Sequence, residues 1–377
     1  MLHMKRAAVR IVCRALFSLF VLITNLEAQT VQSPEVHPDR TVTFRLMAPL
    51  SQKVEVRLDD ASDTKAIPMA KDATGLWAVT SKPLTADVYS YSFTVDTLAV
   101  IDPNVHEFVP NHFEQGGLFT VPGSPAQPWE RTDVPHGEVH HRFYASKIVG
   151  DQRDFYVYTP PGFDPKGNTK YPVLYLLHGY SDMADAWTTM GKANFILDNL
   201  IAQGKAKAMI VVMPLGYGAP EILKSGWKEV DEEPWQHNMD RFVEVLLAEV
   251  IPQIERGYPV IRDRKSRAVA GLSMGGGETF LAGLNHPDLF AWVAPMSAAI
   301  YGDPDKLFPA LDAKEAGKIK LLWIACGKQD DLLKDNRKLK AWLTAKNIKF
   351  TDVETDGAHT WQVWRRNLVE LVPLLFR

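Results

Sequence analysis

Four runs of almost continuously apolar residues recur through the second half of the sequence, and longer segments with helical periodicity separate them. The runs are YPVLYLL (171–177), AMIVVM (208–213), SRAVAG (266–271) and IKLLWIAC (319–326). A strand that is apolar on both sides must be covered on both sides, and the intervening helices provide that cover. The pattern therefore predicts an α/β fold, with a mostly parallel sheet between two layers of helices.

Residues 36–121 follow a different pattern, in which short alternating segments such as KVEVRL (53–58) are broken by glycine, proline and aspartate. Alternation with frequent breaks predicts a small all-β, immunoglobulin-like sandwich. A stretch with four prolines, 121–137, follows and indicates a linker or strap. We thus expect a sandwich over 29–122, a linker over 123–135 and the α/β domain over 136–377.

The first 28 residues have the features of a secretory signal peptide, because four basic residues precede the apolar run 15–23 and the small residue Ala28 follows it. A nine-residue run is too short to span a bilayer, which needs about 20 residues. We therefore expect cleavage after Ala28, a secreted or periplasmic location, and no membrane association of the mature chain.

Charge and cysteine content narrow the range of partners. The formal charge is −3, and removal of four basic residues and Glu27 with the signal peptide changes it to −3 − 4 + 1 = −6. Such a chain lacks the basic surface that nucleic acid requires.

Cys13 leaves with the signal peptide, so Cys326 has no intramolecular disulfide partner and the fold must be held by packing. The sequence gives no indication of the oligomeric state.

The stretch AVAGLSMGGG (268–277) sets Ser273 between glycines, after an apolar run and before a helix expected to start near Gly276 or Gly277. In a nucleophile elbow, the glycines permit a strained turn that lifts the serine above the sheet. The alternative is a small polar residue in a glycine-rich loop. The strand before it and the helix after it favour the nucleophile.

A serine nucleophile needs a histidine base and an acid that orients the base, in the order serine, acid, histidine. His359 lies in a loop before the last helix, and Asp330 lies in the turn that leaves the run 319–326. Asp331 and Asp356 are rival acids, either of which could instead cap a helix or lie in a solvated turn. We favour Asp330, because Asp356 is very close in sequence to the histidine that it would have to face.

Two backbone N–H groups are needed to stabilise the oxyanion. The residue after the nucleophile, Met274, supplies one, and the loop after the run 171–177 supplies the other, for which we select Tyr180. Gly179 lets this loop turn into the site. His178 is interpreted as a structural hydrogen-bonding residue, because His359 already fills the role of base.

Five motifs, YPVLYLLHG, IVVMP, RAVAGLSMGG, IACGKQD and GAHTWQVWR, resemble carbohydrate esterase family 1, the feruloyl and acetylxylan esterases, with relatives such as the esterase-D and mycolyltransferase-like enzymes. The resemblance covers about residues 136–377 and implies an α/β-hydrolase fold, a Ser273–His359–Asp330 triad and oxyanion donors at Tyr180 and Met274. Members often read MPNGY where this chain has MPLGY, so Leu215 replaces a polar pocket residue. Trp187 and Trp361 neighbour the site loops and are the other candidate substrate-binding residues.

The first domain resembles the early-set sandwiches, related to glycogen-binding modules, that precede such esterases; GLWAVT, YSYSFTVD and IDPN carry the likeness. Some of these modules bind polysaccharide through exposed aromatic residues. Here we favour Trp77, Tyr89 and Tyr91 as ordinary core residues. We expect the sandwich to tether polymeric substrate, although Trp129 in the strap could instead anchor the two domains together.

The segment HGEVHH (136–141) contains three histidines that could suggest a metal site. Adjacent residues such as His140 and His141 point to opposite faces of a strand, so we assign no metal there.

The combined expectation is a secreted serine esterase that works through an acyl-enzyme and needs no cofactor. The family resemblance alone implies its substrate, an acyl or feruloyl ester on plant polysaccharide or oligosaccharide. The first alternative is an acyltransferase with a sugar acceptor. The second is a carbohydrate-binding protein whose hydrolase domain has lost its activity.

Overall fold

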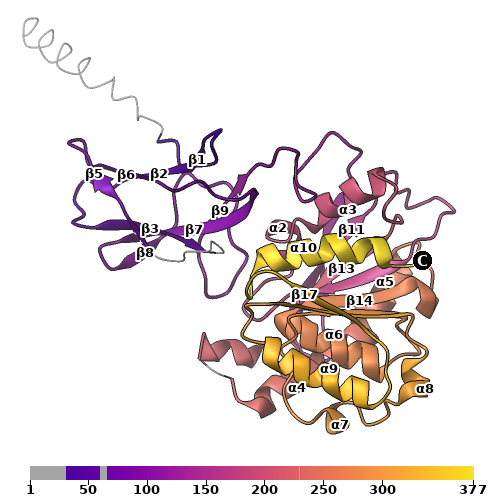
Figure 1. Ribbon diagram of the computed structural model, residues 1–377. Coiled ribbons are helices and arrows are strands. Elements are labelled where there is room, and N and C mark those ends of the chain that lie inside the picture. Colours follow the sequence, from indigo (N-terminus) through magenta and orange to yellow (C-terminus); the bar gives the residue numbers. More distant parts are fainter. Residues whose placement is uncertain (1–30, 60–65, 229) are drawn as a thin grey trace, which may run out of the picture.

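The computed structural model describes residues 31–59, 66–228 and 230–377, so the expected signal peptide lies outside the described residues. These residues form a β-sandwich beside a larger α/β domain (Figure 1). Within the described ranges, no helix is both long enough and apolar enough to cross a membrane.

The α/β domain is built on one eight-stranded sheet. In spatial order its strands are β10 (Glu138–Ala145), β11 (Gln152–Thr159), β13 (Ile210–Pro214), β12 (Val173–Leu177), β14 (Arg267–Leu272), β15 (Trp292–Met296), β16 (Leu321–Gly327) and β17 (Thr351–Thr355). Strands β10 and β11 pair antiparallel, and the strands from β13 to β17 are parallel. The four apolar runs of the sequence form β12, β13, β14 and β16, which confirms the predicted fold class.

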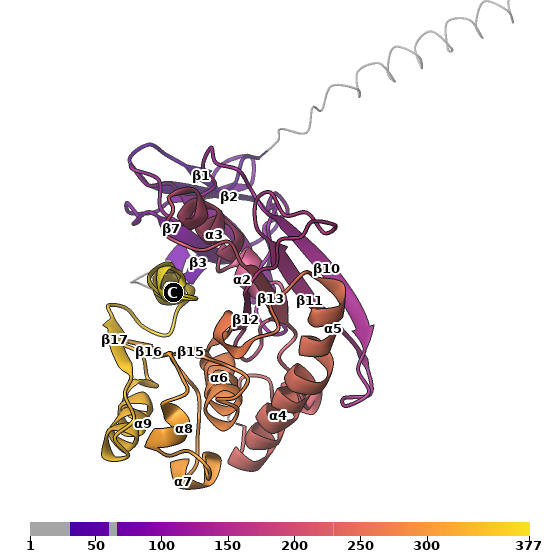
Figure 2. The same ribbon diagram turned by 90° about the vertical axis from the view of Figure 1, so that its right-hand side faces the viewer.

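Helices cover both faces of this sheet, as Figure 2 shows. One face carries α4 (Glu232–Val245), α5 (Ile251–Gly257), α6 (Ser273–Asn285) and α9 (Leu333–Ala345), and the other carries α2 (Ala186–Thr189), α3 (Ala193–Ala202) and α10 (Trp361–Leu371). The remaining short helical segments are Pro220–Ser225, Leu246–Val250, Arg264–Ser266, α7 (Pro304–Leu307), α8 (Ala313–Ala316) and Val372–Leu374. Two separate apolar cores result, one on each side of the sheet.

The sandwich packs two small sheets face to face. One holds β1 (Glu35–Val36), β2 (Val42–Met47), β6 (Leu76–Thr80) and β5 (Ala70–Lys71); the other holds β4 (Ile67–Pro68), β3 (Val54–Asp59), β7 (Asp87–Val95), β8 (Leu98–Val100) and β9 (Gly117–Val121). Trp77, Tyr89 and Tyr91 lie in the core between the sheets. All three are buried, so they are core residues, as the sequence interpretation favoured.

The second half of the proline-rich strap, residues 128–137, is bound to the α/β domain. Trp129 is buried in the same apolar core as α3 and α10. The Asn199 side chain on α3 donates to the carbonyls of Pro128 and Glu130, both at 2.8 Å. At the end of the strap, His136 Nδ1 lies 2.9 Å from Asp198 Oδ2. The strap is therefore a fixed connection between the domains.

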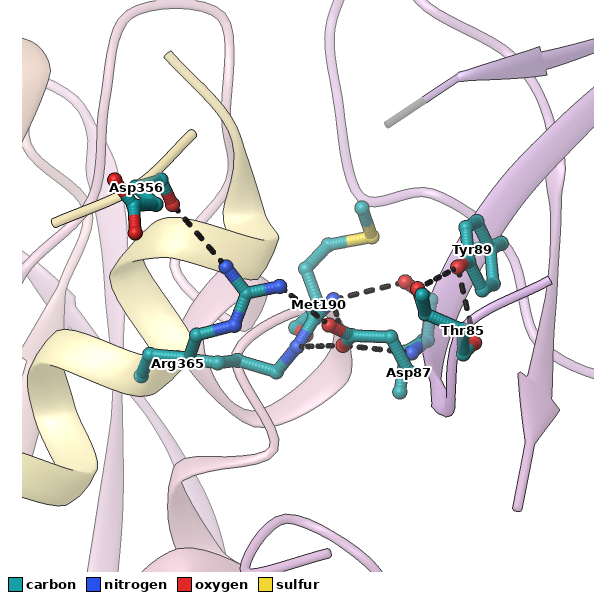
Figure 3. A network of polar contacts seen from close by, with 8 residues as sticks. Thr85, Asp87, Tyr89, Met190, Asp356 and Arg365 are labelled. Atoms are coloured by element: carbon teal, nitrogen blue, oxygen red, sulfur yellow. Dashed lines mark hydrogen bonds and ion pairs between the residues drawn. The ribbon is translucent and has the colours of Figure 1, made fainter. Parts of the chain in front are cut away.

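A buried ion pair joins the sandwich directly to α10 (Figure 3). Asp87, the first residue of β7, accepts hydrogen bonds from Arg365 Nε at 2.9 Å and Nη2 at 2.7 Å, and the two side chains are 1% and 0% exposed. The same guanidinium donates to the carbonyls of Val88 and Met190. The two domains thus share a desolvated interface, which contradicts the expectation that the sandwich is only a tether.

We expect Asp87→Ala to lower the free energy of unfolding by about 3–5 kcal/mol, because it leaves the Arg365 guanidinium buried without its counter-ion. Urea denaturation followed by tryptophan fluorescence measures this. Glu35→Ala, which removes the partly exposed Glu35–Arg45 pair, is the control and should cost about 0–1 kcal/mol. Equal losses in the two variants would contradict a stabilising role for the buried pair.

Candidate active site

Ser273 lies at the junction of β14 and α6, which begins three or four residues earlier than the sequence interpretation expected. Its φ of +52° falls in the left-handed region, where a residue with a side chain is strained. A Cβ on Gly271 would lie 2.4 Å from the Gly275 carbonyl oxygen, and a Cβ on Gly275 would lie 2.4 Å from the His178 carbonyl oxygen. Only glycines fit these two positions, so the strand and helix can approach closely enough to form an elbow.

His359 connects the serine to an acid. Its Nε2 lies 3.0 Å from Ser273 Oγ, and its Nδ1 lies 2.9 Å from Asp330 Oδ2. Asp330 follows β16 at the carboxyl end of the sheet, and its side chain is fully buried. The edge of the Trp364 ring packs against the imidazole, with centroids 4.8 Å apart. The three side chains thus have the hydrogen-bond arrangement that a nucleophile, a base and an orienting acid require.

The rival acids lie elsewhere. Asp356 is exposed and forms an ion pair with Lys328 at 2.8 Å. Asp331 is exposed at the margin of the cavity, and the carboxylate that accepts the hydrogen bond of His359 Nδ1 is that of the neighbouring Asp330. Burial raises the pKa of the Asp330 carboxyl, but hydrogen bonding and charge interaction with His359 outweigh burial, so the pKa lies below its usual value. Asp330 is therefore ionised at neutral pH.

Tyr180 and Met274, the expected oxyanion donors, flank Ser273. Met274 is the second residue of α6, and Tyr180 follows β12 in the turn Gly179–Asp182. Within the described part of the chain, neither backbone N–H donates to a protein acceptor. Both groups are therefore available to an oxygen bound beside Ser273.

His178 orients the peptide that carries the Tyr180 N–H. Its Nε2 accepts the Gly216 N–H at 2.8 Å, which requires the proton on Nδ1, and Nδ1 donates to the Gly179 carbonyl at 2.8 Å. Burial lowers the pKa of His178 to about 4, so the ring is neutral at neutral pH. Because a trans peptide points its C=O and N–H in opposite directions, fixing the Gly179 carbonyl also fixes the Tyr180 N–H. Both ring nitrogens of His178 thus bind backbone groups, as expected of a structural hydrogen-bonding residue.

A cavity of about 490 Å³ opens over Ser273 and His359. One wall is aromatic and consists of Tyr180, Trp227, Trp235 and Tyr301. Their rings contact one another, with centroids 5.7 Å apart for Tyr180 and Trp235 and 5.9 Å apart for Trp235 and Tyr301. The volume and the mixture of apolar walls with a few polar groups suit a small organic ligand.

The three expected substrate-binding residues have different positions. Trp361 lines the cavity. Trp187 is completely buried behind it, with its Nε1–H donating to the Leu177 carbonyl, so the expectation that it contacts substrate is wrong. Leu215 lies outside the cavity lining and packs against the core, where its carbonyl accepts a hydrogen bond from Arg153. Being close in sequence to a site loop did not bring Trp187 into the site, and the family motif that suggested Leu215 did not place that residue in the cavity lining.

The sandwich domain contributes residues that the sequence interpretation missed. Ser90, Val109, Asn111 and Glu114 line the same cavity as Ser273. Tyr301 was also missed, although it follows β15 at the carboxyl end of the sheet. The position of Tyr301 after a parallel strand could have indicated it. No local pattern marks the four sandwich residues, because their approach depends on how the domains dock.

The three histidines of 136–141 have separate partners. His136 contacts Asp198, His140 lies 3.3 Å from Thr159 Oγ1, and His141 contacts Asp154 at 2.7 Å. Among the described residues, no group of three or more histidine, cysteine or acidic side chains is arranged to hold a metal ion.

Comparison with known proteins now identifies the family. The Esterase family model matches residues 146–375. The chain belongs to this esterase family. Residues 31–105 match carbohydrate-binding module 48, the isoamylase N-terminal domain, in agreement with the predicted early-set sandwich.

Curated relatives include an endo-1,4-beta-xylanase/feruloyl esterase from Xylanibacter ruminicola, 31% identical over 91% of this chain, and an acetyl esterase from Caldicellulosiruptor saccharolyticus, 26% identical over 51%. The chain spans 46% of the first relative and the match to the second covers 79% of that protein. Among solved structures, a ferulic acid esterase matches 64% of this chain and 98% of its own length, with a TM-score of 0.54 and 28% identity.

A further structural match includes both domains. The enterobactin esterase of Shigella flexneri matches 94% of this chain and 98% of its own length, with a TM-score of 0.67 and 17% identity. At that identity, the match bears on the fold alone. It supports the arrangement of a β-sandwich followed by an α/β-hydrolase domain.

We expect Asp330→Asn to lower kcat about 10⁴-fold, because an amide facing His359 Nδ1 favours the wrong tautomer of the base. Steady-state kinetics on p-nitrophenyl acetate measure this. Asp331→Asn and Asp356→Asn are the matched controls and should keep the wild-type kcat. Loss of activity in either control, with Asp330→Asn still active, would assign the acid to another residue.

Proposed function

We propose that this protein is a serine esterase that hydrolyses carboxylic esters through an acyl-enzyme. The observation that carries the proposal is the chain of hydrogen bonds from Ser273 through His359 to Asp330, three residues that line one cavity. Beside them, the backbone N–H groups of Tyr180 and Met274 have no protein acceptor among the described residues. Membership of the esterase family supports the same reaction class.

In the acylation step, His359 Nε2 takes the proton of Ser273 as Oγ attacks the ester carbonyl carbon. The negative oxygen of the tetrahedral intermediate accepts hydrogen bonds from the N–H groups of Tyr180 and Met274. The ionised Asp330 stabilises the imidazolium that forms. His359 then passes the proton to the leaving alcohol oxygen, the C–O bond breaks, and the acyl group remains on Ser273.

In the deacylation step, a water molecule takes the place of the alcohol. His359 removes its proton, the hydroxide attacks the acyl carbon, and the same two N–H groups stabilise the second oxyanion. Collapse of this intermediate returns the proton to Ser273 and releases the acid. Every proton transfer uses a side chain of the protein, so the proposed reaction needs no cofactor.

We propose that the acyl group is aromatic, of the hydroxycinnamoyl class such as ferulate, esterified to plant polysaccharide or oligosaccharide. The wall formed by Tyr180, Trp227, Trp235 and Tyr301 offers ring faces and edges against which a planar acyl chain can pack. The names of the Xylanibacter ruminicola relative and of the 28%-identical structure support this choice. The composition of residues 1–28 further supports export of the protein from the cytoplasm.

The test of the nucleophile is Ser273→Ala, which should lower kcat/KM on methyl ferulate about 10⁵- to 10⁶-fold, because no other step of the mechanism works without the attacking oxygen. Release of ferulate is followed by chromatography, and circular dichroism verifies that the variant is folded. A folded variant that keeps more than about a hundredth of the wild-type rate would refute the proposed function.

The test of the acyl group is Trp227→Ala, which removes an exposed ring from the aromatic wall. We expect KM for methyl ferulate to rise about three- to tenfold, the equivalent of one lost aromatic contact. KM for methyl acetate, measured by titration of the released acid, should stay unchanged. Phe143→Ala, which removes an equally exposed ring on β10, is the control. Equal effects of Trp227→Ala on both esters would argue against an aromatic acyl site.

A further inference from the structure

The turn Gly179–Asp182, which carries the Tyr180 N–H, has a strained backbone. Ser181 has a φ of +71°, in the left-handed region that favours glycine. The Asp182 N–H closes the turn on the Gly179 carbonyl at 3.3 Å, the same oxygen that His178 binds. A non-glycine residue keeps such a conformation only where its surroundings hold it there. The neighbours of this turn therefore decide where the Tyr180 N–H points.

The sandwich domain supplies much of that support through a segment between β8 and β9, residues 107–116, which we call the arm. The His112 N–H donates to the Ser181 carbonyl at 2.7 Å, and the Met183 N–H donates to the Pro110 carbonyl at 3.0 Å. Asn111 and Asp182 form an antiparallel bridge. The arm thus pairs with the backbone of the turn as a short strand would.

Asn111 adds the side-chain part of this contact. Its Nδ2 donates to Ser181 Oγ at 2.7 Å and to Asp182 Oδ1 at 3.1 Å, and its Oδ1 accepts the N–H groups of Phe113 and Glu114. The other oxygen of the Asp182 carboxylate lies 3.4 Å from the Gly179 N–H. Asn111 therefore contacts both residues that close the turn, while its own position is fixed by the arm.

The α/β domain holds other parts of the same loop. The Tyr180 hydroxyl donates to the carbonyls of Ile222 and Gly226, which fixes the ring of that residue. The Tyr217 hydroxyl donates to the Asp182 carbonyl. Asn111 adds contacts from the sandwich side, to the Asp182 carboxylate and to the Ser181 hydroxyl.

We propose that Asn111, in the sandwich domain, is a positioning residue for the oxyanion hole of the α/β domain. It holds Asp182, Asp182 holds the Gly179 carbonyl, and that carbonyl directs the Tyr180 N–H into the cavity. The inference rests on the proposed function, because it requires Tyr180 to bind the oxyanion. It assigns to the carbohydrate-binding-module-like domain a part in the chemical step.

The test is Asn111→Asp, which keeps the size of the side chain and the acceptor for Phe113 and Glu114 but sets a carboxylate against that of Asp182. We expect kcat on methyl ferulate to fall about 10- to 100-fold, below the 10²- to 10³-fold cost of losing an oxyanion donor outright. KM should stay within about twofold, because the ground-state ester depends little on the oxyanion hole.

Two further measurements distinguish positioning from a general loss of structure. The affinity for a phenylboronic acid, whose tetrahedral adduct on Ser273 places an oxygen in the oxyanion hole, should fall by the same factor as kcat/KM. The double variant Asn111→Asp, Asp182→Asn exchanges donor and acceptor across the contact, and it should recover kcat to within about threefold of the wild type.

Asn104→Asp is the matched control. Asn104 Nδ2 donates to Asp102 Oδ1 at 3.0 Å within the sandwich, so the substitution creates the same pairing of carboxylates away from the turn. It should leave kcat and boronate affinity unchanged. If Asn111→Asp does not fold, Asn111→Ser removes the contact to Asp182 without adding charge and should show the same fall in kcat.

The inference is overturned if folded Asn111→Asp keeps the wild-type kcat and boronate affinity, or if the double variant folds without recovery. The proposed function fails separately. A Ser273→Ala variant that stays active refutes the esterase mechanism, whereas an inactive Ser273→Ala with a fully active Asn111→Asp refutes only the role of Asn111.

Discussion

The ion pair between Asp87 and Arg365 is the interaction on which the arrangement of the two domains depends. It is buried on both sides, and the guanidinium also reaches the backbone of Val88 and Met190. Burying either charge without its partner would destabilise the fold, so the sandwich and the sheet must dock in the orientation that brings the two side chains together. Because α10 begins two residues after His359, this orientation also locates the helix that follows the loop of the proposed base.

The sandwich reaches the chemistry by a second route. The arm pairs with the turn that carries the Tyr180 N–H, and its residues Asn111 and Glu114 line the cavity. The β-sandwich thus contacts both ends of the proposed machinery, the base through α10 and the oxyanion donor through the turn. A domain with these contacts belongs to the proposed catalytic unit. Its removal would expose part of the apolar core of the α/β domain, against which Val88 and Leu118 of the sandwich pack.

Close backbone packing explains why this site tolerates little change. At the elbow, Gly271 and Gly275 let strand, helix and the loop after β12 approach so closely that a single added methyl group would clash. Strain at Ser273 and Ser181 is held by the surrounding hydrogen bonds. Fixed peptides of this kind are what the proposed oxyanion hole requires, because acyl transfer depends on donors that are already in place.

The sequence alone predicted the α/β class and the sandwich before it, because apolar periodicity is a local property. The sequence also singled out Ser273, His359 and Asp330 from their positions near strand ends, and the structure places these three side chains within hydrogen-bond distance of one another. The sequence could not decide which side chains face the cavity. Trp187 and Trp361 lie near the site loops in sequence, yet only Trp361 lines the cavity, since Trp187 packs behind it. Asn111 joins the site only because the domains dock, and docking depends on contacts between residues as distant in sequence as Asp87 and Arg365. Long-range packing of this kind has no signature in a local stretch of sequence, so only the tertiary structure decided it.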